Sequence, residues 1–121
     1  QMNLLKRIYG KFVFENKKVV AITSTSGTPI GEDEEMLDPE YMEYCKNKKT
    51  LIEYIEQLQQ ELLNKPLSVY DVCPDVVDTD MTKGLWEDLP KLKAEEVAEA
   101  VRYCFESTFN VNKIVVQKNA R

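Results

Sequence analysis

The feature that most constrains this chain is an alternation between short β-branched or apolar runs and longer stretches of helical periodicity. Runs at 18–23, 67–73 and 111–117 are separated by amphipathic stretches at 41–63 and 93–107. Strands that alternate with helices predict an α/β fold with a mostly parallel sheet, because each helix carries the chain back across the sheet. Residues 3–8 indicate one further helix at the start, ended by Gly10.

The amphipathic stretch 41–63 carries a lysine on its apolar face. That face, spaced by threes and fours, comprises Tyr44, Lys48, Leu51, Ile55, Leu58 and Leu62. A charge on such a face is costly unless it has partners. Two interpretations stay open. Either Lys48 extends to solvent while Tyr44 packs, or the two form a functional pair. The second stretch has a stripe of Val97, Val101, Cys104 and Phe105.

Composition excludes several classes of protein. With 121 residues the chain is one domain, 1–121, and its net charge of −5 argues against a nucleic-acid partner. The absence of histidine removes histidine-based triads and most catalytic zinc sites, and we expect no metal. The acidic segment 28–40 is typical of a solvated loop. Three separated cysteines indicate reduced core residues, and the lack of a membrane-spanning or signal segment predicts a cytoplasmic protein without a membrane partner.

Three polar groups follow or begin neighbouring elements of this pattern. Ser24 ends the first strand, Tyr44 opens the long helix, and 74–79 follows the second strand. Ligands of open α/β sheets bind at the carboxyl ends of the strands, so we expect these groups to converge there. Tyr44 and Lys48 are neighbours on one helix face, and an ammonium beside a phenol favours the phenolate and suits acid–base chemistry.

These residues resemble the second half of the short-chain dehydrogenase/reductases, a family with a Rossmann-like fold. The resemblance covers nearly the whole chain in order. It is carried by Ile22-Thr23-Ser24-Thr25-Ser26-Gly27, Tyr44-Cys45-Lys46-Asn47-Lys48-Lys49-Thr50-Leu51, Leu58-Gln59-Gln60-Glu61-Leu62, Val72-Cys73-Pro74-Asp75-Val76-Val77-Asp78-Thr79-Asp80-Met81, and Leu92-Lys93-Ala94-Glu95-Glu96-Val97-Ala98-Glu99-Ala100-Val101. It implies reversible hydride transfer between NADP or NAD and a carbonyl or alcohol substrate.

The resemblance also implies catalytic roles. Tyr44 is expected to exchange a proton with the substrate oxygen, Ser24 to orient that oxygen, and Lys48 to tune Tyr44.

The same resemblance implies a cofactor site. Lys48 would also hold the nicotinamide ribose. Pro74, Val76 and Val77 would line the nicotinamide pocket, and Thr79 would reach the carboxamide or the phosphates.

The chain departs from the family pattern in three places. It has no glycine-rich nucleotide-binding turn, the interval between Ser24 and Tyr44 is long, and Asp75 stands where the family has glycine. The chain is therefore expected to be a partial domain, inactive alone. Two hypotheses follow. It is the C-terminal part of an NAD(P)-dependent oxidoreductase that needs its N-terminal half, or it is a degenerate relative that serves as an interaction or self-assembly module. A bare sheet edge predicts a homo-oligomer or pairing with the missing half.

Overall fold

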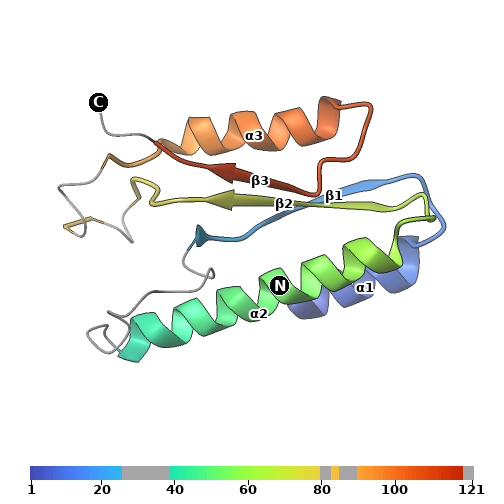
Figure 1. Cartoon of the computed structure of the whole chain (residues 1–121), viewed down its shortest axis with the longest axis horizontal. Helices are drawn as coiled ribbons and strands as arrows, with labels where there is room; N and C mark the ends of the chain where they lie inside the picture. The colour runs from blue at the N-terminus through green and yellow to red at the C-terminus, as the bar shows by residue number, and fades with distance from the viewer. Residues whose placement is uncertain (26–38, 80–82, 85–89, 119–121) are drawn as a thin grey trace.

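The computed structural model describes residues 1–25, 39–79, 83–84 and 90–118. Helices and strands alternate along it, as Figure 1 shows: α1 (Met2–Phe12), β1 (Lys18–Ile22), α2 (Pro39–Glu61), β2 (Ser68–Pro74), α3 (Ala94–Glu106) and β3 (Lys113–Val116). The predicted α/β class is confirmed.

The three strands form one sheet in the order β1-β2-β3, and both pairs are parallel. Lys18 lies opposite Ser68 at the start of the first pair. The second pair runs from Asp71 opposite Lys113 to Pro74 opposite Val116. The carboxyl ends of all three strands therefore lie together along one side of the sheet, which we call the carboxyl edge. This confirms the predicted parallel topology with helical crossovers.

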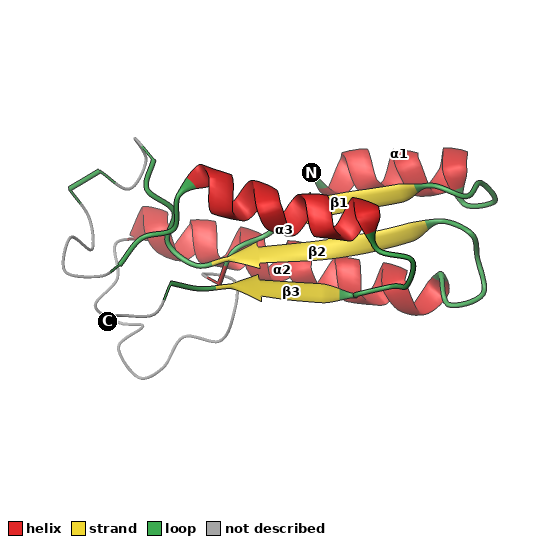
Figure 2. Ribbon diagram, turned by 90° about the horizontal axis from the view of Figure 1, so that it is seen from above, coloured by secondary structure: helices red, strands yellow, loops and turns green. Residues whose placement is uncertain are grey.

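Helices cover both faces of the sheet. α1 and α2 lie on one face and α3 on the other (Figures 1 and 2). Successive side chains of a strand point to opposite faces, so β2 contributes to two cores. Val69 belongs to the core beneath α2, while Tyr70 and Val72 belong to the core beneath α3. β2 is the central strand, which is why most of its residues are buried.

The periodicity of α2 explains how it packs. The four aliphatic residues that the 41–63 pattern places toward the sheet are all buried: Leu51, Ile55, Leu58 and Leu62. Gln59, on the next turn, donates to the carbonyl oxygens of Val69 (2.9 Å) and Asn112 (2.7 Å). The helix is therefore fastened to the sheet by a buried apolar stripe and by one amide that bridges β2 and the start of β3.

Polar side chains cap both ends of α3. The carboxylate of Glu96 accepts the Lys93 N–H at 2.9 Å, which satisfies a donor at the helix start. At the other end the ammonium of Lys18 donates to the carbonyls of Cys104 (3.2 Å) and Phe105 (3.1 Å). A cation at a helix C-terminus is favourable because it meets the negative end of the helix dipole.

Two sequence predictions are wrong in detail. Gly10 lies inside α1, which continues to Phe12 because Tyr9 and Phe12 pack against the core and outweigh the helix cost of a glycine, about 1 kcal/mol. Phe105 was expected in the apolar stripe of α3 but is 52% exposed. The partners in that stripe, Val97 and Cys104, are buried as predicted. Most of the acidic loop 28–40 lies outside the described residues.

Among the described residues, the sheet has an open edge at β1 and another at β3. Within the described ranges β1 pairs with β2 alone, and Ile22 at its end is 45% exposed. No helix in the described part of the chain has the length and apolar character needed to cross a bilayer.

Candidate active site at the carboxyl edge of the sheet

The segment that carries Ser24 lies directly beside the end of β2. The Thr23 N–H donates to the Val72 carbonyl at 2.9 Å, which extends the β1–β2 pairing by one residue. Two residues later the Thr25 hydroxyl donates to a carboxylate oxygen of Asp75, also at 2.9 Å. Ser24, between them, is half-buried. The structure thus brings the Ser24 segment and the start of the 74–79 loop together.

Tyr44 and Lys48 meet on the first turns of α2, whose beginning lies at the same end of the sheet as the strand tips (Figure 1). The Lys48 ammonium stands 5.7 Å from the centroid of the Tyr44 ring. The Tyr41 ring stacks on Tyr44 from the preceding turn, with centroids 6.2 Å apart and 22° between the planes. The predicted pair is therefore in contact through the ring face, and a second tyrosine that the sequence analysis did not single out supports it.

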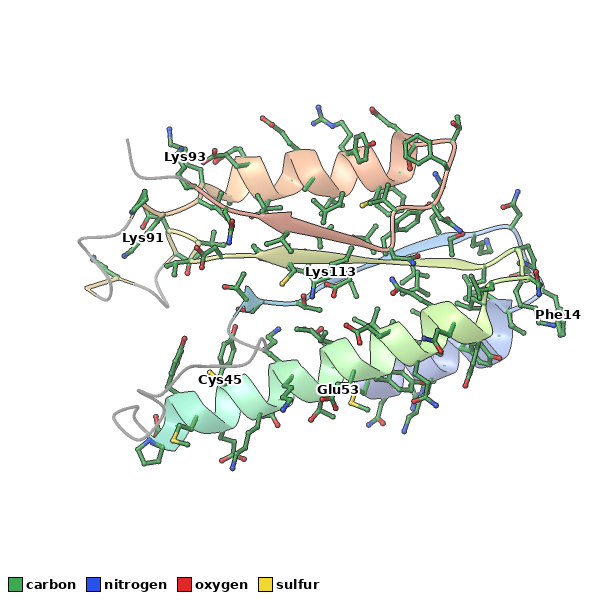
Figure 3. The ribbon with its side chains drawn as sticks, in the orientation of Figure 1. Phe14, Cys45, Glu53, Lys91, Lys93 and Lys113 are labelled. Carbon is green, nitrogen blue, oxygen red and sulfur yellow. The ribbon has the colours of Figure 1, made fainter. Side chains whose placement is uncertain are left out.

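Cys45, next to Tyr44, shows which way this part of α2 faces. It is buried, and Figure 3 shows it on the side of α2 that is turned to the sheet. Cys45, Cys73 and Cys104 are all free thiols in the interior, as their spacing predicted. Burial raises the pKa of the Cys104 thiol, and the nearby Lys18 charge opposes that shift. In the described residues no group of three His, Cys, Asp or Glu is placed to hold a metal ion.

The loop after β2 is tied to the segment that enters α3. The Leu92 N–H donates to the Val76 carbonyl and the Asp78 N–H to the Leu92 carbonyl, each at 2.8 Å, so Val77 forms an isolated parallel bridge with Leu92. Val76 and Val77 are half-buried. These bonds set the course of the loop across the sheet edge.

The ends of this loop differ in their surroundings. Pro74 is the buried last residue of β2, and Thr79 is exposed. Lys91 and Lys93 stand at the same end of the molecule in Figure 3. The two half-buried valines, the exposed Thr79 and the two lysines thus belong to the same end of the molecule.

A buried carboxylate beneath α2 was not found from the sequence. Asp71, 2% exposed, accepts a hydrogen bond from the Thr23 hydroxyl at 2.6 Å. Burial raises the pKa of Asp71, the Thr23 bond and the Lys113 charge oppose the shift, and the Glu56 charge adds to it. The available signal was an acidic residue in the middle of an otherwise apolar strand.

The sequence is similar to that of a bacterial oxidoreductase from two strains. No protein-family model matches the chain. An uncharacterized oxidoreductase of Staphylococcus epidermidis, found in both strains, is 31% identical over 77 residues. That match covers 61% of this chain and 34% of the relative.

Solved structures match over almost the entire chain. A short-chain dehydrogenase from Burkholderia cenocepacia, in complex with NADP, superimposes with a TM-score of 0.74 at 16% identity, over 97% of this chain and 45% of that one. A short-chain dehydrogenase/reductase from Vibrio parahaemolyticus gives 0.69 at 23% identity, over 97% and 50%. The chain therefore has the partial Rossmann-like fold of about half of a short-chain dehydrogenase, and spans about a third of the length of the curated relative.

Proposed function

We propose that this chain supplies the substrate side of an NAD(P)-dependent oxidoreductase that interconverts a carbonyl and an alcohol. One observation carries the proposal. The Ser24 segment and the loop after β2 lie side by side at the carboxyl edge of the sheet, and the Tyr44–Lys48 pair lies on the first turns of α2, the helix between them in the sequence. The likeness in fold to short-chain dehydrogenases supports the same assignment.

Each residue has a role that follows from its chemistry. The Tyr44 hydroxyl gives a proton to a carbonyl oxygen during reduction and takes it back from the alcohol during oxidation. The Lys48 ammonium lies 5.7 Å from the centroid of the Tyr44 ring and supplies positive charge beside the phenol during proton transfer. The Ser24 hydroxyl donates to the same substrate oxygen and orients it.

The described residues suit the nicotinamide end of NAD(P). Lys48 offers an ammonium to ribose hydroxyls, and the half-buried Val76 and Val77 offer an apolar surface to a flat ring. Thr79 is an exposed hydroxyl at the end of the same loop. When bound, the cofactor supplies or accepts the hydride.

The diphosphate end needs a further segment. The four glycines of the sequence, Gly10, Gly27, Gly31 and Gly84, form no glycine-rich turn, and Asp75 places a carboxylate at the sheet edge. A strand added to β1 would extend the parallel sheet and bring its own loop to the same edge. We propose that this segment is an N-terminal half of the oxidoreductase, and that the chain is inactive without it.

Titration with reduced nicotinamide mononucleotide tests the half-site directly. This ligand contains the nicotinamide ribose but not the adenosine, so the isolated chain has what it needs to bind it. We expect saturable amide shift changes in an NMR titration at Tyr44, Lys48, Val76 and Val77, with AMP as the negative control. Lys48→Met should weaken binding about tenfold, because a charge-assisted hydrogen bond contributes about 1.5 kcal/mol.

Lys49→Met is the matched control for that titration, since Lys49 is the next residue and is exposed. It should leave the affinity unchanged. Shifts that appear equally with AMP, or equal weakening by both lysine variants, would show nonspecific attraction of an anion and defeat the proposal.

The proton-transfer role needs turnover and therefore a reconstituted protein. Once the chain is joined to a nucleotide-binding segment, Tyr44→Phe should lower turnover of carbonyl and alcohol substrates by about 10² to 10⁴ without weakening nucleotide binding. Unchanged turnover would remove Tyr44 from the chemistry.

A second function is favoured by one observation, the open edge of β1 with the exposed Ile22. The chain would then be a non-catalytic module that assembles with its own copy. Its mass measured by light scattering over a range of concentrations separates the two. A folded monomer at all concentrations contradicts self-assembly, whereas a dimer that ignores the nicotinamide ligand supports it.

A further inference from the structure

Two threonine–aspartate hydrogen bonds flank Ser24 in the chain. On one side the Thr23 hydroxyl donates to Asp71 at 2.6 Å, and on the other the Thr25 hydroxyl donates to Asp75 at 2.9 Å. Both acceptors belong to β2 or to the residue that follows it. Ser24 lies between the two donors, so a hydrogen bond on each side of it ties this segment to the central strand or to the residue just after it.

The β2 side of this arrangement is itself rigid. Asp71 is paired in the β2–β3 ladder opposite Lys113, and its N–H donates to the Asn112 carbonyl at 2.9 Å. The Asp75 N–H donates to the Val116 carbonyl, also at 2.9 Å. The backbone of each aspartate is thus held by β3 or the residue before it, while the side chain of each aspartate holds a threonine next to Ser24.

The inner aspartate is costly to the fold. A carboxylate that is 2% exposed loses most of its hydration, and an apolar residue of similar size at that position of β2 would not carry this cost. The groups that face it are the hydroxyl of Thr23, just after β1, the Glu56 carboxylate from α2 and the Lys113 ammonium from β3. Its carboxylate accepts a hydrogen bond from the hydroxyl of Thr23, the residue next to Ser24, which points to a use at that residue.

We propose that Asp71 and Asp75 are positioning residues that hold the Thr23–Thr25 stretch, and with it the Ser24 hydroxyl, in place for a substrate oxygen. This inference rests on the proposed function, because it assigns the two aspartates to the site in which Ser24 orients substrate. Neither aspartate touches substrate. They act through the threonines, and a hydroxyl fixed in advance loses less entropy when the substrate binds.

The experiment measures the backbone order of Ser24 in the free chain by ¹⁵N relaxation, together with the urea midpoint of unfolding. The inner bond is removed as a pair, with Thr23→Val and Asp71→Leu combined, because replacing both partners by apolar groups of similar shape is nearly neutral for stability. The outer bond is removed by Thr25→Val, which leaves the half-buried Asp75 in contact with water. Asp78→Asn, an exposed carboxylate on the same loop, is the control.

We expect the order parameter of the Ser24 amide to fall from about 0.85 toward about 0.6 in each variant, while the order of residues 18–22 stays as in the parent and the unfolding midpoint does not fall. The control should change neither quantity. Unchanged Ser24 order in both variants overturns the proposal. So does a loss of order spread along β1 with a lowered midpoint, or failure of the paired variant to fold, since either result makes the bonds structural.

The test uses no nucleotide, so its result is separate from the nicotinamide titration. If Ser24 loosens as expected but the parent chain ignores the nicotinamide ligand, the positioning bonds stand and the proposed function fails. If the ligand binds and Ser24 never loosens, the proposed function stands and the two aspartates are not positioning residues.

Discussion

At the scale of single residues, the buried carboxylate of Asp71 makes the stability of the fold depend on pH. Its carboxylate lies in the interior between Thr23 and the underside of α2, and burial raises its pKa. The folded chain consequently binds the Asp71 proton more tightly than the unfolded chain does. Between the ordinary aspartate pKa and the raised pKa, the unfolded chain has lost the Asp71 proton and the folded chain still holds it. The free energy of unfolding therefore falls as the pH rises through this interval.

Asp71→Asn should flatten that part of the stability curve. The amide oxygen still accepts from the Thr23 hydroxyl while the buried charge disappears, so the free energy of unfolding at neutral pH should increase by about 1 kcal/mol. Urea unfolding from pH 4 to pH 8, with Asp78→Asn as the exposed control, provides the measurement. A variant less stable than its parent at neutral pH would mean that Lys113 offsets the desolvation of the carboxylate.

At the scale of elements, Lys18 connects the start of β1 to the end of α3. It starts β1, yet its ammonium donates to carbonyls in the last turn of α3 and to that of Ser107, the residue after the helix. The same ammonium lies 5.8 Å from the centroid of the Tyr70 ring. Those carbonyls have no partners within the helix, so the lysine satisfies several acceptors at once. The end of α3 is thereby fixed to the start of the sheet.

Lys18→Met should destabilise the chain by about 1 kcal/mol, because the methionine keeps most of the apolar side chain and removes the ammonium that caps α3 and lies over Tyr70. Lys46→Met, on the exposed side of α2, is the matched control and should have almost no effect. Chemical denaturation measures both. Equal changes in the two variants would assign the loss to net charge rather than to the cap.

The elements also show how far sequence reasoning reaches. Periodicity located α2 because Leu51, Ile55, Leu58 and Leu62 repeat over several turns, and a repeated signal survives local exceptions. The prediction that Gly10 ends the first helix was wrong because a helix tolerates one glycine when the residues on either side of it pack against the core. The Tyr44–Lys48 contact follows from helix geometry alone. The Asp71–Thr23 bond does not, because it depends on the register of two strands far apart in the chain.

At the scale of the whole molecule, the sheet has two edge strands, β1 and β3. β3 is at one edge with Val115 50% exposed, and β1 is at the other with Ile22 45% exposed. A strand at an open edge presents unpaired backbone groups that another strand can meet. The chain spans about half of the short-chain dehydrogenase structures that it matches, and an added strand at β1 belongs to the proposed function.

Ile22→Lys should therefore reduce any self-association of the chain, since a charge on an edge strand opposes pairing. Sedimentation velocity at several concentrations should show the parent chain associating and the variant shifted toward monomer. Val115→Lys, a similarly exposed β-branched residue on the opposite edge strand, is the control and should leave association unchanged. The reverse pattern would place the contact at β3.

The parallel pairing of the strands has a consequence for how the chain folds. Val19 pairs with Val69, fifty positions later, and Asp71 pairs with Lys113, forty-two positions later. Each strand pair must close a long loop before it gains any stability, and such high contact order slows folding. During synthesis, β1 cannot pair with β2 until residues 68–74 have been made, and Lys18 cannot cap α3 until that helix has been made. These contacts therefore form late, well after β1 itself has been synthesised.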